Sequence, residues 1–481
     1  MRKVLGARVE VGQGAIETTR WGSITIGPMN RVIIDYYRCP EKLVDLQLAG
    51  KLSENPGYFR FGHQTICYGN SASGFRSHRV SGQLYDTLTD VRANGGSVRL
   101  PLHPDEIIDN LRYERYWHNG DRTQERFVDH SHIRSLYYWL RPLLPVDVRK
   151  YLQRAHLNNW KSIRFPHWPV DRTVERILDR LLALCMKAQG IHQMPFVWFW
   201  PDGARSCAIM THDVENLPGR KFCSQLMDLD DSMAIKSSFG LVPERRYPVP
   251  GELLEEIRNR GFEIAIHDLN HDGRLFSSYK HFRRMVERIN AYGREYGAAG
   301  FRSGGLYRNQ AWYGALEFSY DMSVPSVGHL EPQRGGCCSV MPFFIGKILE
   351  LPLTMVEDYS LFHILRDYSI DLWKEQLATV MANHGLASFI VHPDYIIEQR
   401  ARKMYQALLE HLAQMRDERG IWIALPGEVD RWWRKRSQMR VVGEEGTWRI
   451  EGVGKERARL AFATLVGDEL DFTIEGPNAS V

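Results

Sequence analysis

Short apolar runs alternate with longer stretches of helical spacing through the middle of the chain, from about residue 196 to 435. The apolar runs are CAIMTHDV, AIKSSFGLVP, FEIAIHDL, AAGFRSGG, YDMSVPS, ILELPLT, ASFIVHPD and IWIALPGEV. Between them lie amphipathic stretches such as PGELLEEIRNRG and YKHFRRMVERINAYGREYG. Strands that alternate with helices are typical of a parallel α/β sheet. Because the unit recurs seven to eight times, the pattern predicts a distorted (β/α) barrel of seven to eight strands.

The segments that flank this region follow other patterns. Residues 1–195 open with short alternating runs rich in Gly, Ser, Tyr and Arg, and helical spacing takes over from about residue 104. We expect an N-terminal α+β accessory domain there, of unknown role. Residues 436–481 alternate with period two around glycine turns, which predicts a small antiparallel β unit. The predicted barrel domain therefore spans residues 196–435.

Composition and charge exclude some classes of protein. A formal charge of +4 over 481 residues gives no concentrated basic surface, so we expect no nucleic-acid partner. The N-terminus lacks the apolar core of a signal peptide, and no window approaches 18 uninterrupted apolar residues. The 7 cysteines are scattered, which fits reduced thiols better than a disulfide framework. We therefore expect a cytoplasmic protein.

Ionisable residues stand at the ends of four of the predicted strands. Active sites of (β/α) barrels lie at the carboxyl ends of the strands, so these residues should converge on one rim. They are Asp213 and Glu215, His267 and His271, Arg302, and His392 with Asp394. Most other positions of these strands are apolar, which makes this rim the candidate site.

The spacing of the two histidines suits a metal ion. Imidazoles four residues apart, such as those of His267 and His271, meet on one side of a helical turn and can hold one divalent ion. The third ligand is then a carboxylate or a further histidine. Asp213 and Glu215 are two residues apart, so in an extended strand both face the same side. One of them can bind the metal while the other stays free as a base.

The order of these motifs resembles the polysaccharide deacetylase family, the NodB-type domain of metal-dependent carbohydrate esterases. The segments THDVE, HDLNH, FRSGG, YDMSVPS and IVH stand where that family carries its five motifs. The resemblance covers residues 207–394 and, with the last predicted strand, a little over half of the chain. One position departs from the family pattern, because the second family Asp, a metal ligand, falls on Val214.

The resemblance implies a role for each matching residue. Glu215, His267 and His271 would bind one divalent metal ion, zinc in the first place, with cobalt, manganese or nickel as alternatives. Asp213 would be the general base that takes a proton from the attacking water, although an exchange of roles between Asp213 and Glu215 stays open. Arg302 would pair with the base, and His392 would be the general acid.

Supporting roles are implied as well. Asp321 or Asp394 would hold an imidazole in position, and a backbone N–H near residue 303 or 304 would stabilise the oxyanion. His212 stands where the family has Phe. By strand alternation it faces away from Asp213, and we leave it off the metal.

We therefore expect a hydrolase that removes acetyl groups, N-acetyl rather than O-acetyl, from a sugar or glycan precursor in exopolysaccharide or cell-envelope polysaccharide biosynthesis. The substrate could be lipid-linked, with residues 136–169 resting on the inner face of the membrane, although a packing face is the commoner explanation of such a segment. Two alternatives stay open. One is a hydrolase of another C–N bond, such as a cyclic amide. The other is a catalytically silent glycan-binding or scaffold protein, which Val214 favours.

Overall fold

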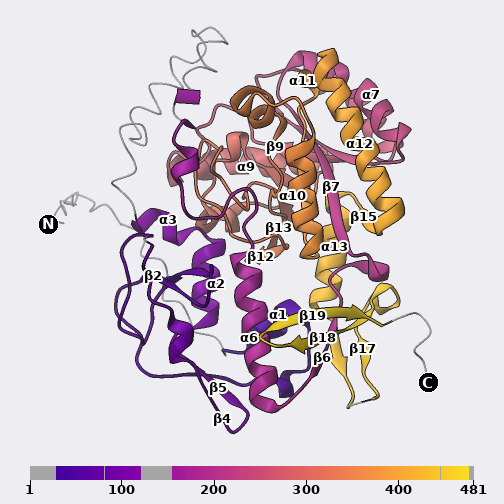
Figure 1. Ribbon diagram of the computed structural model, residues 1–481. Helices are drawn as coiled ribbons and strands as arrows, with labels where there is room; N and C mark the ends of the chain where they lie inside the picture. Colours follow the sequence, from indigo (N-terminus) through magenta and orange to yellow (C-terminus); the bar gives the residue numbers. More distant parts are fainter. Residues whose placement is uncertain (1–28, 81, 121–153, 156, 445, 476–481) are drawn as a thin grey trace, which may run out of the picture.

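A nine-stranded sheet forms the centre of the computed structural model, which describes residues 29–80, 82–120, 154, 155, 157–444 and 446–475 (Figure 1). Its strands are, in order, β12 (Phe343–Ile345), β13 (Ile348–Glu350), β11 (Tyr320–Asp321), β10 (Gly300–Arg302), β9 (Glu263–His267), β8 (Ser237–Leu241), β7 (Ser206–Val214) and β14 (Leu386–Ile390), with β15 (Ile421–Ile423) also on β7. Every pair is parallel except β12 with β13. Each of the eight predicted apolar runs overlaps one of the parallel strands.

Strand β7 pairs along both of its edges. Residues 207–211 pair with β14, whereas residues 206–208 pair with β15 and residues 210–214 with β8. Because the first two pairings overlap, β14 and β15 lie on opposite edges of β7. The sheet is open between β13 and β14, and beyond β13 Met355 N donates to Ser388 O of β14 at 3.3 Å. The predicted distorted (β/α) barrel is confirmed.

Helices cover the outside of the barrel. They are α7 (Leu217–Ser232), α8 (Gly251–Asn259), α9 (Tyr279–Glu295), α10 (Asp371–Ala382), α11 (Pro393–Ile396), α12 (Gln399–Arg419) and α13 (Pro426–Ser437). Helix α9 shows why they form, since the side chain of Ser278 caps its first turn at 3.2 Å from His281 N. Its core-facing residues recur three and four positions apart: Phe282, Met285, Val286 and Ile289. This spacing gives one apolar face, and the opposite face is rich in Arg.

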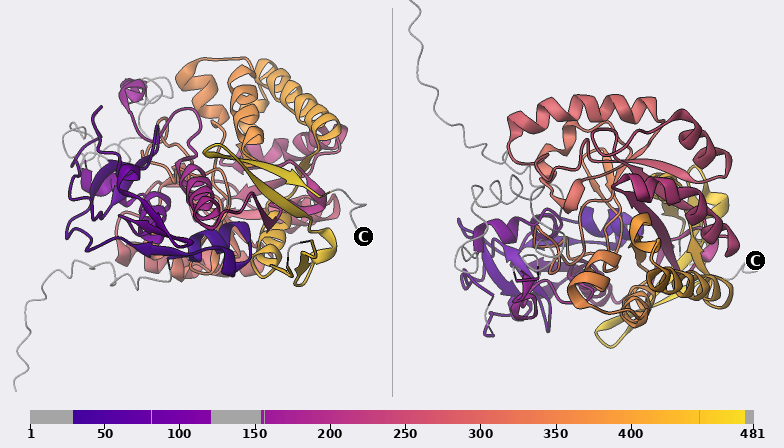
Figure 2. Two further views of the ribbon diagram at one scale, coloured as in Figure 1. Left: turned by 60° about the horizontal axis from the view of Figure 1, so that its bottom comes forward. Right: turned by 90° about the horizontal axis from the view of Figure 1, so that it is seen from above.

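The N-terminal region is α+β, as predicted, and lies to one side of the barrel (Figures 1 and 2). Its sheets are β1 (Leu46–Leu48), β5 (Ser97–Leu100) and β4 (Arg92–Asn94), and β2 (Gly57–Arg60) with β3 (Ile66–Gly69). Its helices are α1 (Arg31–Tyr37), α2 (Pro104–Arg112), α3 (Arg115–Gly120) and α6 (Thr173–Gln189). The apolar face of α6 is buried.

The C-terminal segment forms antiparallel pairs, as predicted. Strand β16 (Arg440–Val442) pairs with β17 (Arg449–Glu451), and β18 (Leu460–Val466) pairs with β19 (Glu469–Ile474). Strand β18 also pairs with β6 (Gln193–Val197), which precedes the barrel in the chain. The C-terminal strands thus share a sheet with the end of the N-terminal region, and the domain boundaries at 195 and 435 stay predictions.

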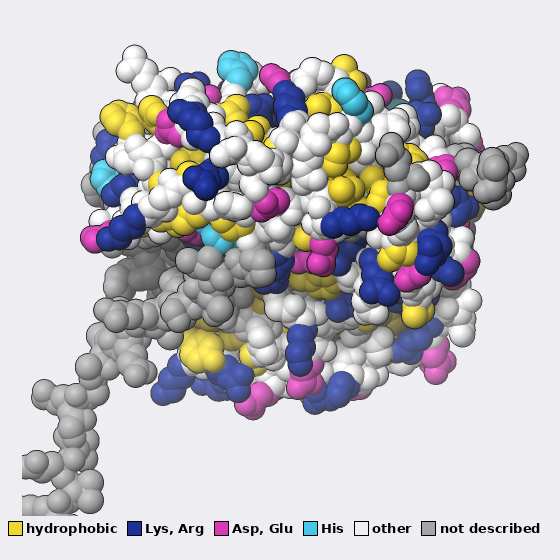
Figure 3. All heavy atoms as spheres, turned by 90° about the horizontal axis from the view of Figure 1, so that it is seen from below, with side chains coloured by type: hydrophobic (Ala, Val, Ile, Leu, Met, Phe, Trp, Pro, Cys, Tyr) yellow, Lys and Arg dark blue, Asp and Glu magenta, His cyan; other side chains and the backbone are white. Residues whose placement is uncertain are grey.

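The surface carries charges of both signs. On the face shown in Figure 3, Lys and Arg side chains are interspersed with Asp and Glu, which agrees with the small net charge of +4. In the part of the chain that the structure describes, no helix combines the length and apolar character needed to cross a membrane. Most of the predicted membrane-contact segment 136–169, namely residues 136–153 and 156, lies outside the described residues.

Candidate functional site

The carboxyl ends of β7, β9, β10 and β14 bring all six predicted site residues into one cluster. The strands place them because parallel neighbours end at the same rim, and Arg302 is in register with His267. Glu215 and His392 follow the last residues of β7 and β14 within two positions. The closest contacts within the cluster join Asp213 to Arg302 at 2.8 Å and Glu215 to His271 at 2.9 Å.

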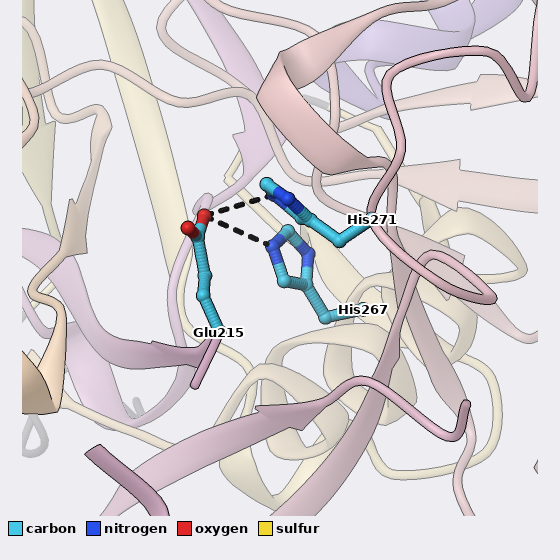
Figure 4. A group of neighbouring side chains, drawn as sticks. All are labelled: Glu215, His267 and His271. Carbon is cyan, nitrogen blue, oxygen red and sulfur yellow. Dashed lines mark ion pairs between the residues drawn. The ribbon is translucent and has the colours of Figure 1, made fainter. Parts of the chain in front are cut away.

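Glu215, His267 and His271 form a group that can hold a metal ion. Figure 4 shows both imidazoles turned towards one oxygen of Glu215. The Oε1 atom lies 2.9 Å from Nε2 of His271 and 3.7 Å from Nε2 of His267, and the candidate ligand atoms lie within 4.8 Å of one another. Both Nε2 atoms are buried and make no hydrogen bond within the described structure. Two buried imidazole nitrogens beside a carboxylate fit a divalent ion, since such nitrogens otherwise need a partner.

His271 reaches the site on a strained turn and not on the helical turn that we expected. Asp268 has φ 59° and His271 has φ 52°, both in the left-handed region. Two contacts hold the turn: Asp268 N donates across to Arg302 O at 2.8 Å, and within the turn Asp272 N donates to Oδ1 of Asn270 at 3.1 Å. The spacing of four residues was informative, but polar turn contacts produce the juxtaposition.

The two histidines differ in what their Nδ1 atoms contact. Nδ1 of His267 lies 3.3 Å from the carbonyl oxygen of Arg302, so it donates there and leaves a lone pair on Nε2. Nδ1 of His271 lies 3.1 Å from a guanidinium nitrogen of Arg246, which also donates to the carbonyl oxygen of His271. Because a guanidinium can only donate, Nδ1 of neutral His271 accepts and Nε2 carries the hydrogen. A metal on His271 therefore requires the Arg246 contact to open.

Asp213 is held in its ionised form by Arg302. Its Oδ1 accepts from Nη1 of Arg302 at 2.8 Å, and its Oδ2 lies 3.6 Å from Nε2 of His267. Burial acts to raise the pKa of Asp213, but Arg302, His267 and His392 outweigh burial and lower it. Gly240 makes room for the pair, because a Cβ there would lie 3.1 Å from Oδ1 of Asp213.

Glu215 is the more open of the two carboxylates. Its side chain keeps 23% of its exposure, compared with 5% for that of Asp213. Burial acts to raise the pKa of Glu215, but the three neighbouring histidines hold it well below its usual value. The two carboxylates are thus both ionised, one tied to an arginine and the other facing only imidazoles.

His392 is oriented by Asp358, a residue that the motifs did not identify. Oδ1 of Asp358 lies 2.7 Å from Nδ1 of His392, and Oδ2 accepts from the backbone N of His392 at 2.7 Å. Burial acts to lower the pKa of His392, but Asp358 and Glu215 raise it well above its usual value. Asp358 follows the predicted strand ILELPLT, so the rule that strand ends carry site residues could have found it.

The prediction that Asp321 or Asp394 holds an imidazole is therefore wrong. Oδ2 of Asp394 accepts from Nδ2 of Asn216 at 2.7 Å, and Asp321 accepts from Ser323 N at 3.0 Å. The predicted position of His212 is right, because its Nε2 faces Asp230 at 3.1 Å on the other side of the strand.

The predicted oxyanion donors are also engaged elsewhere. Ser303 N donates to Oγ of Ser323 at 2.9 Å, and Gly304 N donates to Oδ2 of Asp268 at 3.3 Å. A buried donor remains at Nη2 of Arg302, which has no hydrogen-bond partner in the residues that the structure describes. The expectation that a backbone N–H near residue 303 or 304 stabilises the oxyanion therefore stays a prediction.

Comparisons with known proteins give structural matches only. No family model matches the chain, and no curated protein matches its sequence. A putative polysaccharide deacetylase from Mycobacterium smegmatis matches with 18% identity and TM-score 0.40, over 50% of this chain and 93% of that one. An allantoinase matches with 12% identity and TM-score 0.40, over 49% and 92% of the two chains. A probable polysaccharide deacetylase from Pseudomonas aeruginosa PAO1 matches with 13% identity and TM-score 0.39, over 49% and 93%.

The matched solved structures thus include polysaccharide deacetylases, the family that the motifs of this sequence resemble. They cover about half of this chain. We infer the function of this chain from its own site.

Proposed function

We propose that this chain is a metal-dependent hydrolase that removes an acetyl group from the amine of a sugar or glycan precursor. One observation carries the proposal: Glu215, His267 and His271 converge between an Asp213–Arg302 pair and a His392–Asp358 pair. A metal site lies between a carboxylate held ionised and an imidazole held protonated. This is the arrangement that hydrolysis of an amide requires.

Two imidazoles and one carboxylate are the ligand set of many catalytic zinc sites. In this chain Glu215, His267 and His271 would hold the ion, and Val214 has its side chain in the core. When bound, a divalent ion lowers the pKa of water and polarises a carbonyl group. Glu215 thus replaces the carboxylate that the family motif would place at position 214.

Asp213 is placed to take the proton of the attacking water. Arg302 holds Oδ1, so Oδ2 is the oxygen that faces His267 at 3.6 Å and is left for the water. Because Arg302 keeps Asp213 ionised, the base is ready at neutral pH. The water oxygen then bonds to the acetyl carbon as Oδ2 receives the proton.

His392 is placed to protonate the departing nitrogen. Its Nε2 lies 3.5 Å from Oε1 of Glu215, on the metal side of the ring, while Asp358 holds Nδ1. An amide nitrogen leaves only when it is protonated, which a histidine kept in its protonated form provides. The C–N bond breaks as the nitrogen takes the His392 proton, and the products are acetate and a free amine. This requirement supports an N-acetyl rather than an O-acetyl substrate.

The cellular setting is part of the proposal. We propose a cytoplasmic enzyme of exopolysaccharide or cell-envelope polysaccharide biosynthesis, with a soluble or lipid-linked precursor as substrate. All seven cysteines are buried and unpaired, which supports a reducing compartment. Zinc is our first choice of metal because nitrogen and carboxylate ligands suit it, and cobalt, manganese and nickel bind the same ligand types.

The first test is the metal content of the purified full chain by elemental analysis, compared with His271→Ala and Glu215→Ala. An exposed histidine variant, His78→Ala, is the matched control. We expect about one ion per chain in the wild type and in His78→Ala, and loss of the ion in the two site variants. Acetate release from N-acetylated sugar oligomers should follow the same order.

Each other outcome changes the assignment. If Glu215→Ala keeps its metal while His271→Ala loses it, Asp213 is the ligand and the two carboxylates exchange roles. If the wild type binds no ion even after soaking with zinc, cobalt or manganese, the hydrolase is wrong and a glycan-binding or scaffold protein is favoured.

A further inference from the structure

The N-terminal region reaches the rim of the barrel through one buried carboxylate, that of Glu114. Glu114 stands in the turn between α2 and α3, which lie beside the barrel (Figure 1), and has φ 55° in the left-handed region. Its side chain is 2% exposed, and that of its partner Arg308 is fully buried at 0%. A non-glycine residue holds this backbone conformation only where its surroundings fix it.

Four donors from two loops of the barrel meet on this carboxylate. Its Oε2 accepts from Nε of Arg308 at 2.6 Å and from Nε2 of Gln310 at 2.9 Å. Its Oε1 accepts from Nη2 of Arg308 and from the backbone N of Gly336, the latter at 2.6 Å. The Glu114–Arg308 pair is therefore bidentate and charge-assisted, which makes it one of the stronger kinds of hydrogen-bonded pair. At Gly335 a Cβ would lie 2.5 Å from Oε1 of Glu114, so glycine lets the loop come this close.

Arg308 also forms hydrogen bonds within its own loop and to the segment around Gln333. Its Nη1 donates to the carbonyl oxygens of Leu306 at 2.9 Å and Gln333 at 3.2 Å. Its backbone N donates to Oε1 of Gln333 at 3.0 Å. One buried pair thus ties the segment 303–310 to the segment 333–336, and both to the N-terminal region.

The segment held in this way lines the candidate site. It begins directly after Arg302, the residue that holds Asp213. Gly304 packs on the ring of His271, because a Cβ there would lie 2.8 Å from Cδ2 and 3.2 Å from Nε2. Leu306, with φ 53°, belongs to a small buried apolar cluster with Leu353 and Ile390, and Ile390 stands two residues before His392.

Different contacts hold the two ends of this segment. At its start, Ser303 N and Gly304 N donate to Oγ of Ser323 and Oδ2 of Asp268. Between β10 and Arg308 it contains only a short 3-10 turn, with Gly305 and Leu306 both at positive φ. A short irregular segment of this kind opens at low free energy unless a buried contact fixes it. The buried contact at its far end is the pair with Glu114.

We propose that Glu114 is a positioning residue of the site, which acts through Arg308 to hold residues 303–308 against His271 and Ile390. The N-terminal region is then part of the catalytic unit and not an independent module attached to it. The kinetic consequences rest on the proposed hydrolase function. The consequences for metal affinity and loop opening do not, so the two proposals can fail separately.

The test compares Glu114→Gln with Arg172→Ala in the full chain. Gln keeps the size of the side chain but removes the charge that faces Arg308. Arg172 supplies a matched control, because its guanidinium contacts Oδ1 of Asn383 and so also joins the N-terminal region to the barrel. Asn383 lies after α10, before β14 begins, and thus at the opposite end of the strands from the site.

Three quantities are measured: hydrogen exchange of residues 303–310, the affinity for zinc or cobalt, and the kinetics of acetate release. We expect Glu114→Gln to speed hydrogen exchange of residues 303–310 by about 10-fold or more and to weaken zinc or cobalt binding by about 3- to 10-fold. The kcat for acetate release should fall by about 100-fold with KM changed less than about 3-fold, because misplaced groups slow the chemical step. Arg172→Ala should lower the unfolding temperature and leave all three values at the wild-type level.

The opposite results would overturn the proposal. If both variants lower the unfolding temperature and neither changes exchange, metal affinity or kcat, Glu114 only joins two parts of the fold. Should Glu114→Gln fail to fold, the paired variant Glu114→Leu with Arg308→Met removes both charges at similar volume. That variant should show the same fast exchange and weakened metal binding, and wild-type values in it would also overturn the proposal. If the wild type binds metal but releases no acetate, the hydrolase fails while exchange and metal affinity still decide the role of Glu114.

Discussion

Buried carboxyl groups near the rim of the barrel fall into two sets that the protein treats in opposite ways. Asp213 and Glu215 face an arginine and three histidines, and the pKa of each is lowered although burial acts to raise it. Asp321 and Glu350 lie side by side on neighbouring strands, and burial raises the pKa of both. The same β-sheet rim thus holds one pair of carboxyl groups whose pKa values are lowered and one pair whose pKa values are raised.

The difference lies in the neighbours and not in the depth of burial. A carboxyl group that leaves water must either gain a cation or keep a proton. Asp321 and Glu350 follow the second course, since burial raises the pKa of both, and they accept from the backbone N of Ser323 and of Val324 at 3.0 Å. Asp213 and Glu215 gain cations and are the groups available to hold a metal or accept a proton. The cations around the rim therefore decide which carboxyl groups can do chemistry.

Removal of the Arg302 charge should raise the pKa of Asp213, as burial raises that of Asp321 and Glu350. This is the largest effect that we expect. In Arg302→Met, burial acts on Asp213 without its main opposing charge, so the pKa of Asp213 rises. The base is then protonated at neutral pH, and kcat/KM for acetate release should fall by about 100- to 1,000-fold. The acid limb of the pH–rate profile should move to higher pH, so part of the activity returns as the pH rises.

Arg302→Lys is the control for charge alone. It should keep the acid limb near its wild-type position, since an ammonium still faces Asp213. An acid limb that stays unchanged in Arg302→Met would show that the neighbouring histidines alone keep Asp213 ionised.

Glu175 extends the comparison to a buried carboxyl that gained no cation partner in direct contact. Its Oε1 accepts from Oγ of Ser339 at 2.5 Å, and burial raises its pKa from 4.5 to about 7. A raised pKa means that the folded state binds more protons, so stability is present below pH 4.5 and is lost as pH rises to about 7. The loss amounts to about 3 kcal/mol of unfolding free energy, from about 1.4 kcal/mol per pH unit.

Glu175→Gln removes this titration and keeps an acceptor for Ser339. Urea unfolding at pH 5 and pH 8 measures the effect. The unfolding free energy of the wild type should fall from pH 5 to pH 8 by more than that of Glu175→Gln. The difference between the two proteins should change by about 3 kcal/mol at most. A constant difference between the two proteins at both values would show that Glu175 is ionised throughout, as Asp213 is.

A substitution at Asp358 tests the role of His392 as general acid, as a substitution at Arg302 tests the role of Asp213 as general base. In Asp358→Asn, His392 loses the neighbour that does most to raise its pKa against burial, so that pKa falls. The alkaline limb of the pH–rate profile should then move to lower pH, and kcat should fall by about 30-fold. Asp371→Asn, at an exposed carboxylate on α10, should leave the limb in place. An alkaline limb that does not move in Asp358→Asn would remove His392 from the role of general acid.

The barrel could be predicted well from the sequence, because strands buried on both faces of a parallel sheet consist of continuous apolar runs. All nine residues of β7 are buried, and the run CAIMTHDV is its direct trace. The same logic placed Asp213, Glu215, His267, Arg302 and His392 at strand ends. Strand ends are fixed by local pattern, so a single chain suffices to find them.

The sequence failed where a contact joins segments that are distant in the chain. Asp358 reaches His392 from 34 residues away, and Glu114 reaches Arg308 from 194 residues away. Neither pairing leaves a spacing that a pattern can detect. Asp321 and Asp394 also stand at strand ends, but Asp321 accepts from Ser323 two residues on, and Asp394 accepts from Asn216, 178 residues away in the chain.

Arg246 is a third long-range contact, and it gives the smallest and most specific prediction. Its guanidinium donates to Nδ1 of His271, so a metal on Nε2 has to displace it. Arg246→Gln should therefore tighten zinc or cobalt binding by about 3- to 10-fold, because less of the binding free energy is spent on opening that contact.

Titration calorimetry of the full chain measures this, with the exposed neighbour Arg245→Gln as the matched control. Weaker binding in Arg246→Gln would mean the opposite role. Arg246 also donates to the carbonyl oxygen of Asn270 at 3.2 Å, so it would then serve to hold the strained turn that presents His271. The sign of the change in affinity thus separates an arginine that competes with the ion from one that helps to build its site, and it does so in a variant that leaves Glu215, His267 and His271 intact.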